Sequence, residues 1–137
     1  MWEKLEQIAR RCAEIGELLT VPEIYGDAKE LRRLTQEQKE LEPVAQCYED
    51  YRRAERTIAE ATELLSDAEL RDMAQEELRQ AKAEADALGT ALRQAESALT
   101  DARNRAAMLR DMQRDYDGFA RSVRSVMQQA GRGRLSG

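Results

Sequence analysis

The feature that most constrains the fold of this chain is a long, regular stripe of small and branched aliphatic side chains. The stripe advances in alternating steps of four and three residues and consists of Ala74, Leu78, Ala81, Ala85, Leu88, Leu92, Ala95, Leu99, Ala102, Ala106 and Leu109. Apolar residues at these steps fall on one face of an α-helix. About five heptads of this pattern predict one long coiled-coil helix, over about residues 66–116.

The composition supports the same fold class. Charged residues make up 36% of the 137 residues and aromatic residues only 4%, with seven glycines and two prolines. Such a chain has few large side chains for a broad globular core, so its apolar surface must be buried as narrow stripes between helices. We therefore expect an all-α fold, an antiparallel helical hairpin or bundle.

Two shorter helices are predicted before the long one. The first spans residues 3–19, where Leu5, Ile8, Cys12, Ile15 and Leu19 share one face. Pro22 ends this segment, and Asp27 is a good N-cap for a second helix over residues 27–65. Pro43 lies inside that span. Either the second helix kinks there, or one helix ends at Leu41 and another begins with Pro43 in its first turn.

Local signals mark both ends of the long helix. Ser66 and Glu69 have the spacing of a capping box, which predicts the start of the helix. After Leu109 the apolar stripe shifts by one position, and Asp117-Gly118 predicts a bend or a short break before a short C-terminal helix. Residues 131–137 are glycine- and arginine-rich and are predicted to form a flexible tail.

The predicted lengths leave part of the long helix without a partner inside the chain. At 1.5 Å per residue the three helices would measure roughly 25, 58 and 75 Å. The far end, which carries Leu99, Ala106 and Leu109, must fold back on itself, pair with another chain, or stay half exposed. Because an exposed apolar stripe often marks an interaction surface, self-association as a homo-oligomer is one interpretation.

Charge is distributed unevenly. Residues 1–93 carry 14 basic and 22 acidic side chains, whereas residues 94–137 carry eight basic side chains, all arginine, and five acidic ones. Phosphates would repel the acidic part. The arginines of the second part could contact phosphate, but dispersed arginines more often form a solvated helix face. We expect no specific DNA binding.

Residues suited to catalysis or metal binding are scarce. The chain contains no histidine, which removes the commonest general base and metal ligand. The carboxylate pairs Glu76/Glu77 and Asp115/Asp117 fall on predicted solvent faces, where ordinary pKa values are expected. Gly131-x-Gly133 follows no strand and opens no helix, so it does not predict a dinucleotide site. No catalytic, cofactor-binding or metal-binding residue is therefore expected, and no enzyme activity.

The two cysteines, Cys12 and Cys47, are widely spaced and predict neither a zinc site nor a disulfide framework. They are interpreted as small core residues in a reducing cytoplasm. The chain lacks an apolar run of 18 residues and a signal-peptide pattern, so we expect a cytoplasmic protein without membrane association.

The few aromatic residues near the start have two interpretations. Tyr48 and Tyr51, one helical turn apart, could form a patch for a partner or could pack the first helix against the second. Trp2 could be a binding anchor, but a terminal staple onto the bundle is favoured.

Residues 5–93 resemble a known family at three places. They are Leu18-Leu19-x-x-Pro22-Glu23, Leu41-Glu42-Pro43-Val44 followed by Tyr48 and Tyr51, and the most specific run, residues 64–78, Leu-Leu-Ser-Asp-Ala-Glu-Leu-Arg-Asp-Met-Ala-Gln-Glu-Glu-Leu. This part is similar to the N-terminal helical domain of bacterial class I peptide chain release factors of the release factor 1 type. The resemblance implies a cytoplasmic helical module that docks on the ribosome near the factor-binding stalk during translation termination. Gly-Gly-Gln and Pro-x-Thr, the hydrolysis and codon-reading motifs of the family, are absent.

The remainder of the chain resembles a different family. Residues 112–119 and 122–127, with Gly131 and Leu135-x-Gly137, are similar to the coiled coil that enters the hinge of bacterial chromosome-segregation SMC proteins. This gives a division into residues 1–93, a coiled-coil extension over 94–130 and the tail over 131–137. The resemblance implies a fusion, a rearranged gene or an engineered chain, in which the heptads cross the junction near Arg93 in phase.

Two functional hypotheses follow from these observations. The first is a non-catalytic binding module of release-factor type that docks on the ribosome. The alternative is a structural coiled-coil fragment of SMC type that acts by self-association, or a fusion product without independent function.

Overall fold

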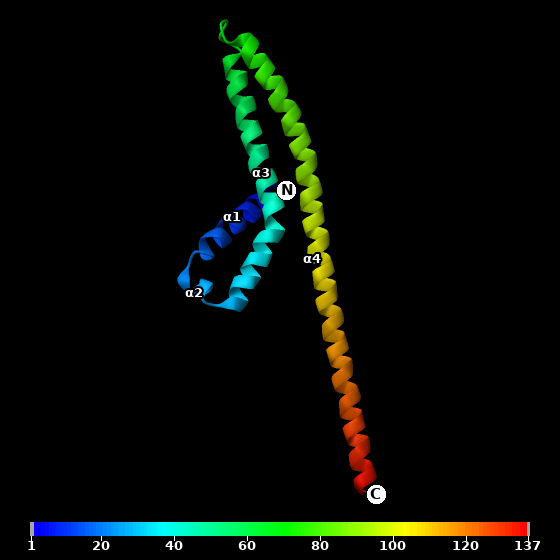
Figure 1. Ribbon diagram of the computed structural model, residues 1–137. Helices are drawn as coiled ribbons and strands as arrows, with labels where there is room; N and C mark the ends of the chain where they lie inside the picture. Colours follow the sequence, from blue (N-terminus) through cyan, green and yellow to red (C-terminus); the bar gives the residue numbers. More distant parts are fainter. Residues whose placement is uncertain (1, 137) are drawn as a thin grey trace. The chain divides into compact units, whose positions relative to one another are not determined.

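The structure, a computed structural model, describes residues 2–136, with side chains described for residues 2–131. Four helices account for most of these residues: α1 (Trp2–Leu18), α2 (Pro22–Tyr25), α3 (Ala28–Leu64) and α4 (Arg71–Ser136) (Figure 1). The described part of the chain contains no strand, which confirms the all-α prediction. The chain divides into unit 1, Met1–Leu99, and unit 2, Thr100–Gly137, and α4 contributes to both.

The core of unit 1 forms where α1, α3 and the first part of α4 meet. The predicted face of α1 is buried at Leu5, Ile8 and Ile15, which confirms the three-and-four spacing. The remaining buried members of the cluster are Leu34, Leu41, Val44 and Tyr48 of α3 and Leu92 and Leu99 of α4. Each fully buried aliphatic side chain contributes about 1.5–3 kcal/mol to folding. This cluster therefore holds the three helices together.

The connection from α1 to α3 contains one more helical turn than predicted. Pro22 opens the short helix α2, because its fixed φ angle suits the first position of a helix and its missing N–H costs nothing there. The predicted N-cap is confirmed. The Asp27 carboxylate accepts hydrogen bonds from the backbone N–H groups of Lys29 and Glu30, each at 3.2 Å, at the start of α3.

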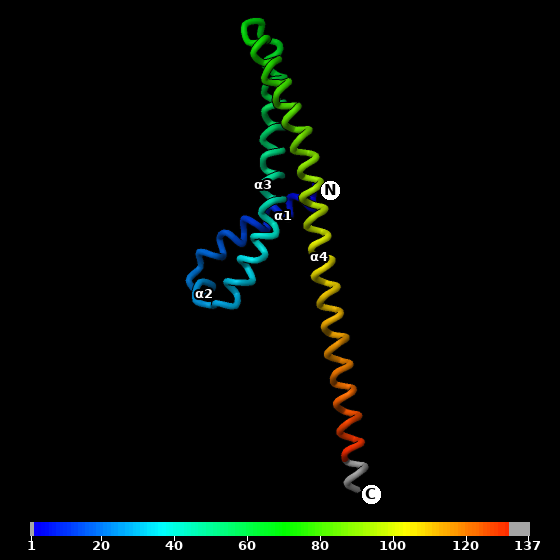
Figure 2. The backbone as a smooth tube through the Cα atoms, turned by 45° about the vertical axis from the view of Figure 1, so that its right-hand side comes forward, coloured from blue at the N-terminus to red at the C-terminus, as the bar shows by residue number. Residues whose placement is uncertain are grey.

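Pro43 lies inside a single continuous helix, which resolves the two alternatives left by the sequence. α3 runs from Ala28 to Leu64 without a break, and it changes direction in its middle (Figures 1 and 2). Proline removes one N–H···O=C bond of the helix and its ring displaces the preceding turn, which is a known cause of such a bend.

The capping box predicted for Ser66 and Glu69 is not formed. The Ser66 hydroxyl donates to the Glu63 carbonyl at 3.0 Å, and the Glu69 N–H donates to the Asp67 carboxylate at 2.9 Å. Ser66 therefore belongs to the C-terminal end of α3, because its hydroxyl donates to a carbonyl of that helix. α4 begins at Arg71, five residues later than the sequence predicted.

α4 extends further than predicted. It continues through Asp117-Gly118 to Ser136, so the predicted bend and the separate C-terminal helix are both wrong. A glycine inside a helix costs only about 1 kcal/mol relative to alanine, which does not end a helix unless a turn gains partners in exchange. Residues 131–136 of the predicted tail belong to α4, and Gly137 lies outside the described residues. The predicted domain boundary after residue 93 stays a prediction.

Candidate functional site

A cluster of three aromatic rings fixes the start of α1 to α3. The Trp2 ring stacks on Tyr51, with ring centroids 5.3 Å apart, and lies 6.0 Å from the Tyr48 ring. The Tyr48 hydroxyl donates a hydrogen bond of 3.4 Å to the Glu6 carboxylate. Trp2 is 43% exposed, so the cluster is a staple at the surface and not a buried anchor. The structure thus confirms the staple predicted for Trp2 and the packing role of the two tyrosines.

Two ion pairs link α1 to the other helices of unit 1. The Arg11 guanidinium donates to both oxygens of Glu37, at 2.8 and 3.0 Å, so the pair is bidentate. Hydrogen bonding to Glu37 raises the pKa of Arg11. The Lys4 ammonium lies 2.8 Å from a Glu96 carboxylate oxygen and links α1 to α4. Bidentate arginine–carboxylate pairs restrict geometry as well as adding energy, so these contacts fix how α1 lies on its neighbours.

An open groove of about 540 Å³ lies along α1 and α3. Its lining combines small side chains with polar and charged ones; the lining residues are Ala9, Cys12, Ala13, Gly16, Gln38, Glu42, Ala45, Gln46, Tyr48, Glu49, Arg52 and Arg56. The small side chains leave room for another apolar surface, and the polar ones provide hydrogen-bond donors and acceptors. Grooves of this kind accept amphipathic partners.

The thiols of this region are unsuited to nucleophilic chemistry. Cys12 lines the groove, and burial followed by the nearby charge of Glu42 raises the pKa of its thiol. Burial also raises the pKa of Cys47, whose sulfur lies 4.0 Å from the Leu88 carbonyl oxygen. Both cysteines are free. A raised pKa keeps a thiol protonated at neutral pH, and the thiolate is the reactive form.

The carboxylates singled out in the sequence do not converge on a common point. Glu76 pairs with Arg79 at 2.6 Å, and that contact lowers the pKa of Glu76. Asp117 accepts a hydrogen bond of 3.1 Å from Gln113, and Asp115 is exposed. Across the described side chains, no group of three or more cysteine and acidic residues is placed to hold a metal ion. The expected absence of catalytic, cofactor and metal residues remains a prediction.

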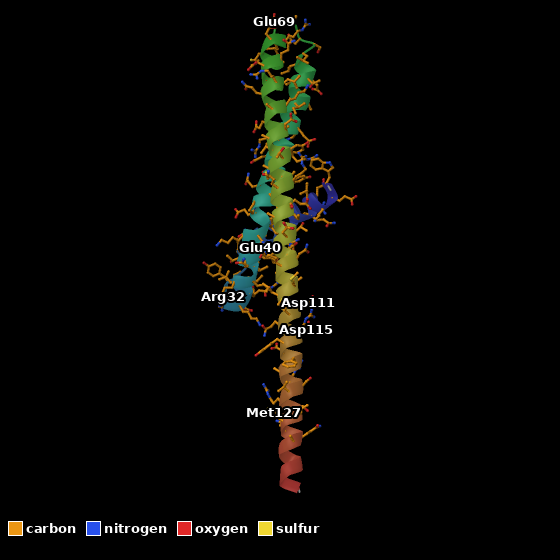
Figure 3. The ribbon with its side chains drawn as sticks, turned by 90° about the vertical axis from the view of Figure 1, so that its right-hand side faces the viewer. Arg32, Glu40, Glu69, Asp111, Asp115 and Met127 are labelled. Carbon is orange, nitrogen blue, oxygen red and sulfur yellow. The ribbon has the colours of Figure 1, made fainter. Side chains whose placement is uncertain are left out.

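Unit 2 presents its large apolar side chains at the surface. The exposed residues are Met108, Leu109, Met112, Tyr116, Phe119, Val123, Val126 and Met127. Figure 3 labels Asp111, Asp115 and Met127, which follow one another along this part of α4. The exposed apolar residues of unit 2 continue the stripe predicted from the sequence, but no other element covers them within the described residues. No helix within residues 2–136 combines the length and apolarity needed to cross a membrane.

The fold and these surfaces define an all-helical module. It combines a packed core in unit 1, an open groove along α1 and α3, and an exposed apolar stripe in unit 2.

Comparison with known proteins identifies the family. The chain belongs to the PCRF domain family, whose model matches residues 8–123. It is 42% identical over 92 residues to peptide chain release factor 1 of Paraburkholderia xenovorans (strain LB400), which covers 67% of this chain and 26% of that protein. It is 40% identical over 82 residues to peptide chain release factor 1 of Burkholderia ambifaria (strain MC40-6), covering 60% of this chain and 23% of that protein.

These matches confirm the resemblance to the release-factor N-terminal domain and define the chain as a release-factor-like helical module. The chain spans about a quarter of the length of the curated relatives it matches. No solved structure matches it. Nothing in the comparisons supports the SMC resemblance of residues 94–137, and the family match continues through residue 123, well past Arg93.

Proposed function

We propose that this chain is a non-catalytic module of release factor 1 type that docks on the ribosome during translation termination in the cytoplasm. The observation that carries the proposal is the family match over residues 8–123, together with 42% identity to a release factor 1 over 92 residues. The aligned residues cover only 26% of that relative, so peptide release itself is not assigned to this chain.

The surface of unit 1 favours a protein partner over RNA for this docking. Residues 1–99 carry 14 basic and 23 acidic side chains, and such a surface is repelled by phosphates. The groove along α1 and α3 combines small side chains with two acidic and two basic ones, Glu42, Glu49, Arg52 and Arg56. These features fit a basic, amphipathic segment of a ribosomal protein.

Competition on the ribosome tests the proposal. The chain is expected to cosediment with ribosomes at micromolar concentration and to be displaced by full-length release factor 1. Ala13→Arg places a large charged side chain in the groove and is expected to weaken binding about tenfold or more, because it occupies space between the small lining residues. Ala83→Arg, at an exposed position of α4 outside the groove, is the matched control and should bind like the natural chain.

Two results would overturn this proposal. Failure of the natural chain to cosediment with ribosomes would rule out ribosome docking. Equal loss of ribosome binding in both variants would rule out the groove as the contact surface. Circular dichroism of each variant establishes that the helices are retained.

Self-association through the stripe of unit 2 is a second candidate, favoured by the exposure of Leu109, Tyr116 and Phe119. Light scattering over a range of concentrations tests it. A molecular mass that stays at the monomer value throughout would rule it out.

A further inference from the structure

Five of the six arginines whose side chains are described in unit 2 lie on one face of α4. Arg103, Arg110, Arg114, Arg121 and Arg124 are separated by seven, four, seven and three residues. Each step is close to a whole number of turns at 3.6 residues per turn, so the five side chains project within a sector about 80° wide. We call this set the arginine ridge. The sixth, Arg105, projects from a different face.

The charges of the arginine ridge are mostly uncompensated. All five side chains are exposed, and within the described residues only Arg114 forms an ion pair, with Asp111. The one acidic residue in the same sector is Asp117, which accepts a hydrogen bond from Gln113. In unit 1, by contrast, six arginines pair with carboxylates; they are Arg10, Arg11, Arg33, Arg52, Arg53 and Arg79. The ridge is therefore free to attract an external anion.

Part of the ridge surrounds a hollow. Arg114, Arg121 and Arg124 line an open pocket of about 490 Å³ together with Asp117 and Ala120. Three guanidinium groups against one carboxylate give this pocket a net positive charge. The planar guanidinium donates pairs of N–H bonds that match the oxygens of a phosphate group. A phosphate is thus the natural occupant.

The shape of the ridge indicates a polymer and not a single small anion. From Arg103 to Arg124 it covers 22 residues, roughly 30 Å of helix at 1.5 Å per residue. A straight row of cations of that length can face several phosphates at once. We propose that the arginine ridge binds the phosphate backbone of a nucleic-acid duplex without reading its sequence.

An anionic membrane, the other extended source of phosphate, fits this helix poorly. The apolar stripe of unit 2 and the ridge lie on nearly opposite faces, roughly 160° apart at 100° per residue. With Tyr116 and Phe119 inserted into a bilayer, the guanidinium groups would point away from the lipid headgroups. Asp111 and Asp115 border the stripe and would instead be pressed against them. A basic membrane-surface helix requires the opposite arrangement.

Fluorescence anisotropy with the full chain tests the proposal. The probes are a labelled RNA duplex and a labelled DNA duplex of the same arbitrary sequence, titrated over a series of salt concentrations. If most of the ridge arginines contact phosphates, the logarithm of the association constant should fall with the logarithm of the salt concentration, with a slope of about −4. Arg110→Gln/Arg114→Gln/Arg121→Gln should make the slope shallower by about 3 and weaken binding at least tenfold at low salt.

The matched control removes the same charge from unit 1. Arg10→Gln/Arg32→Gln/Lys39→Gln alters three exposed basic side chains outside the groove and should leave affinity within about twofold of the natural chain, because the proposal places no phosphate contact in unit 1. Equal loss in both triple variants would show a net-charge effect and overturn the proposal. So would the absence of duplex binding at low salt, or binding to phosphatidylglycerol vesicles in preference to both duplexes.

Binding to both duplexes would support contact with the phosphate backbone of either nucleic acid. Binding to the RNA duplex alone would support contact with the backbone of an A-form duplex. The test needs no ribosome. Duplex binding without ribosome cosedimentation would leave this proposal standing and remove the docking function proposed above.

Discussion

Units 1 and 2 share one helix, yet they use its side chains in opposite ways. In unit 1, the heptad positions of α4 are buried at Ala74, Ala81, Ala85, Leu92 and Leu99. In unit 2, the same kind of stripe is exposed, with Leu109 at 65% and Phe119 at 68%. The comparison teaches that heptad spacing specifies a helix and its apolar face, whereas burial depends on whether another element is available to cover that face.

The arginines repeat this contrast. Arg11 of unit 1 is held by both oxygens of Glu37, while four of the five ridge arginines in the described part of unit 2 have no carboxylate partner. Charge pairing and core packing therefore coincide in unit 1. Unit 2 leaves both its apolar and its basic side chains available for contact.

The largest expected difference between the units is in the free energy of unfolding after removal of a leucine side chain. Leu41→Ala leaves a cavity in the core, where Leu41 is 1% exposed, and should cost about 3 kcal/mol. Leu109→Ala is the matched substitution in unit 2 and should cost less than about 0.5 kcal/mol. Urea denaturation followed by circular dichroism measures both. Similar losses would mean that Leu109 is packed, and the contrast between the units would fail.

Aromatic substitutions should give a smaller difference in the same direction. Trp2→Ala removes two ring contacts and part of the cover over α3, and should cost about 1.5 kcal/mol. Phe119→Ala, at a ring that stacks on no other within the described residues, should change stability by less than about 0.5 kcal/mol. Urea denaturation followed by circular dichroism measures both losses. Equal losses of stability in the two variants would contradict the role of Trp2 as a staple between α1 and α3.

Glycine substitutions sharpen the comparison because both positions lie inside α4. A Cβ at Gly89 would meet the Tyr51 ring at an ordinary distance of 3.6 Å, so Gly89→Ala should stabilise unit 1 by about 1 kcal/mol. A Cβ at Gly118 would meet nothing within 4 Å. Gly118→Ala should raise the helix content and slow the hydrogen exchange of residues 100–136 without moving the unfolding midpoint of unit 1. A shift of that midpoint by Gly118→Ala would show that the units unfold together.

The smallest expected effect is a loss of stability at alkaline pH that arises in unit 1 alone. Burial raises the pKa values of Cys12 and Cys47 above the usual thiol value of 9.0. The unfolded chain therefore loses these protons at lower pH than the folded chain, so the stabilisation is complete below pH 9.0 and declines as pH rises through the folded pKa values. Cys12→Ala/Cys47→Ala should flatten the decline of the urea midpoint with pH. An unchanged slope would exclude the thiols as its source.

The sequence was sufficient for elements whose signals have one physical meaning. The spacing of Leu5, Ile8 and Ile15 predicts the buried face of α1, and Asp27 predicts the start of α3 because a carboxylate there can accept the free N–H groups. These conclusions depend on local geometry alone.

Two predictions failed where a local signal has two physical meanings. The Ser66 hydroxyl can accept from a following N–H or donate to a preceding carbonyl, and the choice depends on where α3 ends. Asp117-Gly118 favours a turn only where the turn gains partners, and α4 offers none there. The groove along α1 and α3 could not be predicted, because Ala9, Ala13 and Ala45 carry no signal until the two helices are placed together.

The ion pair between Lys4 and Glu96 joins residues 92 positions apart, and it has a consequence for the biosynthesis of the chain. α1 leaves the translating machinery before α3 and α4, but Leu92 and Leu99, which complete the cluster around Leu5 and Ile8, are synthesised last among the members of that cluster. α1 can associate with α3 early, and its final covering layer is missing until residue 99 has been added. Throughout that interval Leu5 and Ile8 of the nascent chain stay partly exposed and accessible to molecular chaperones.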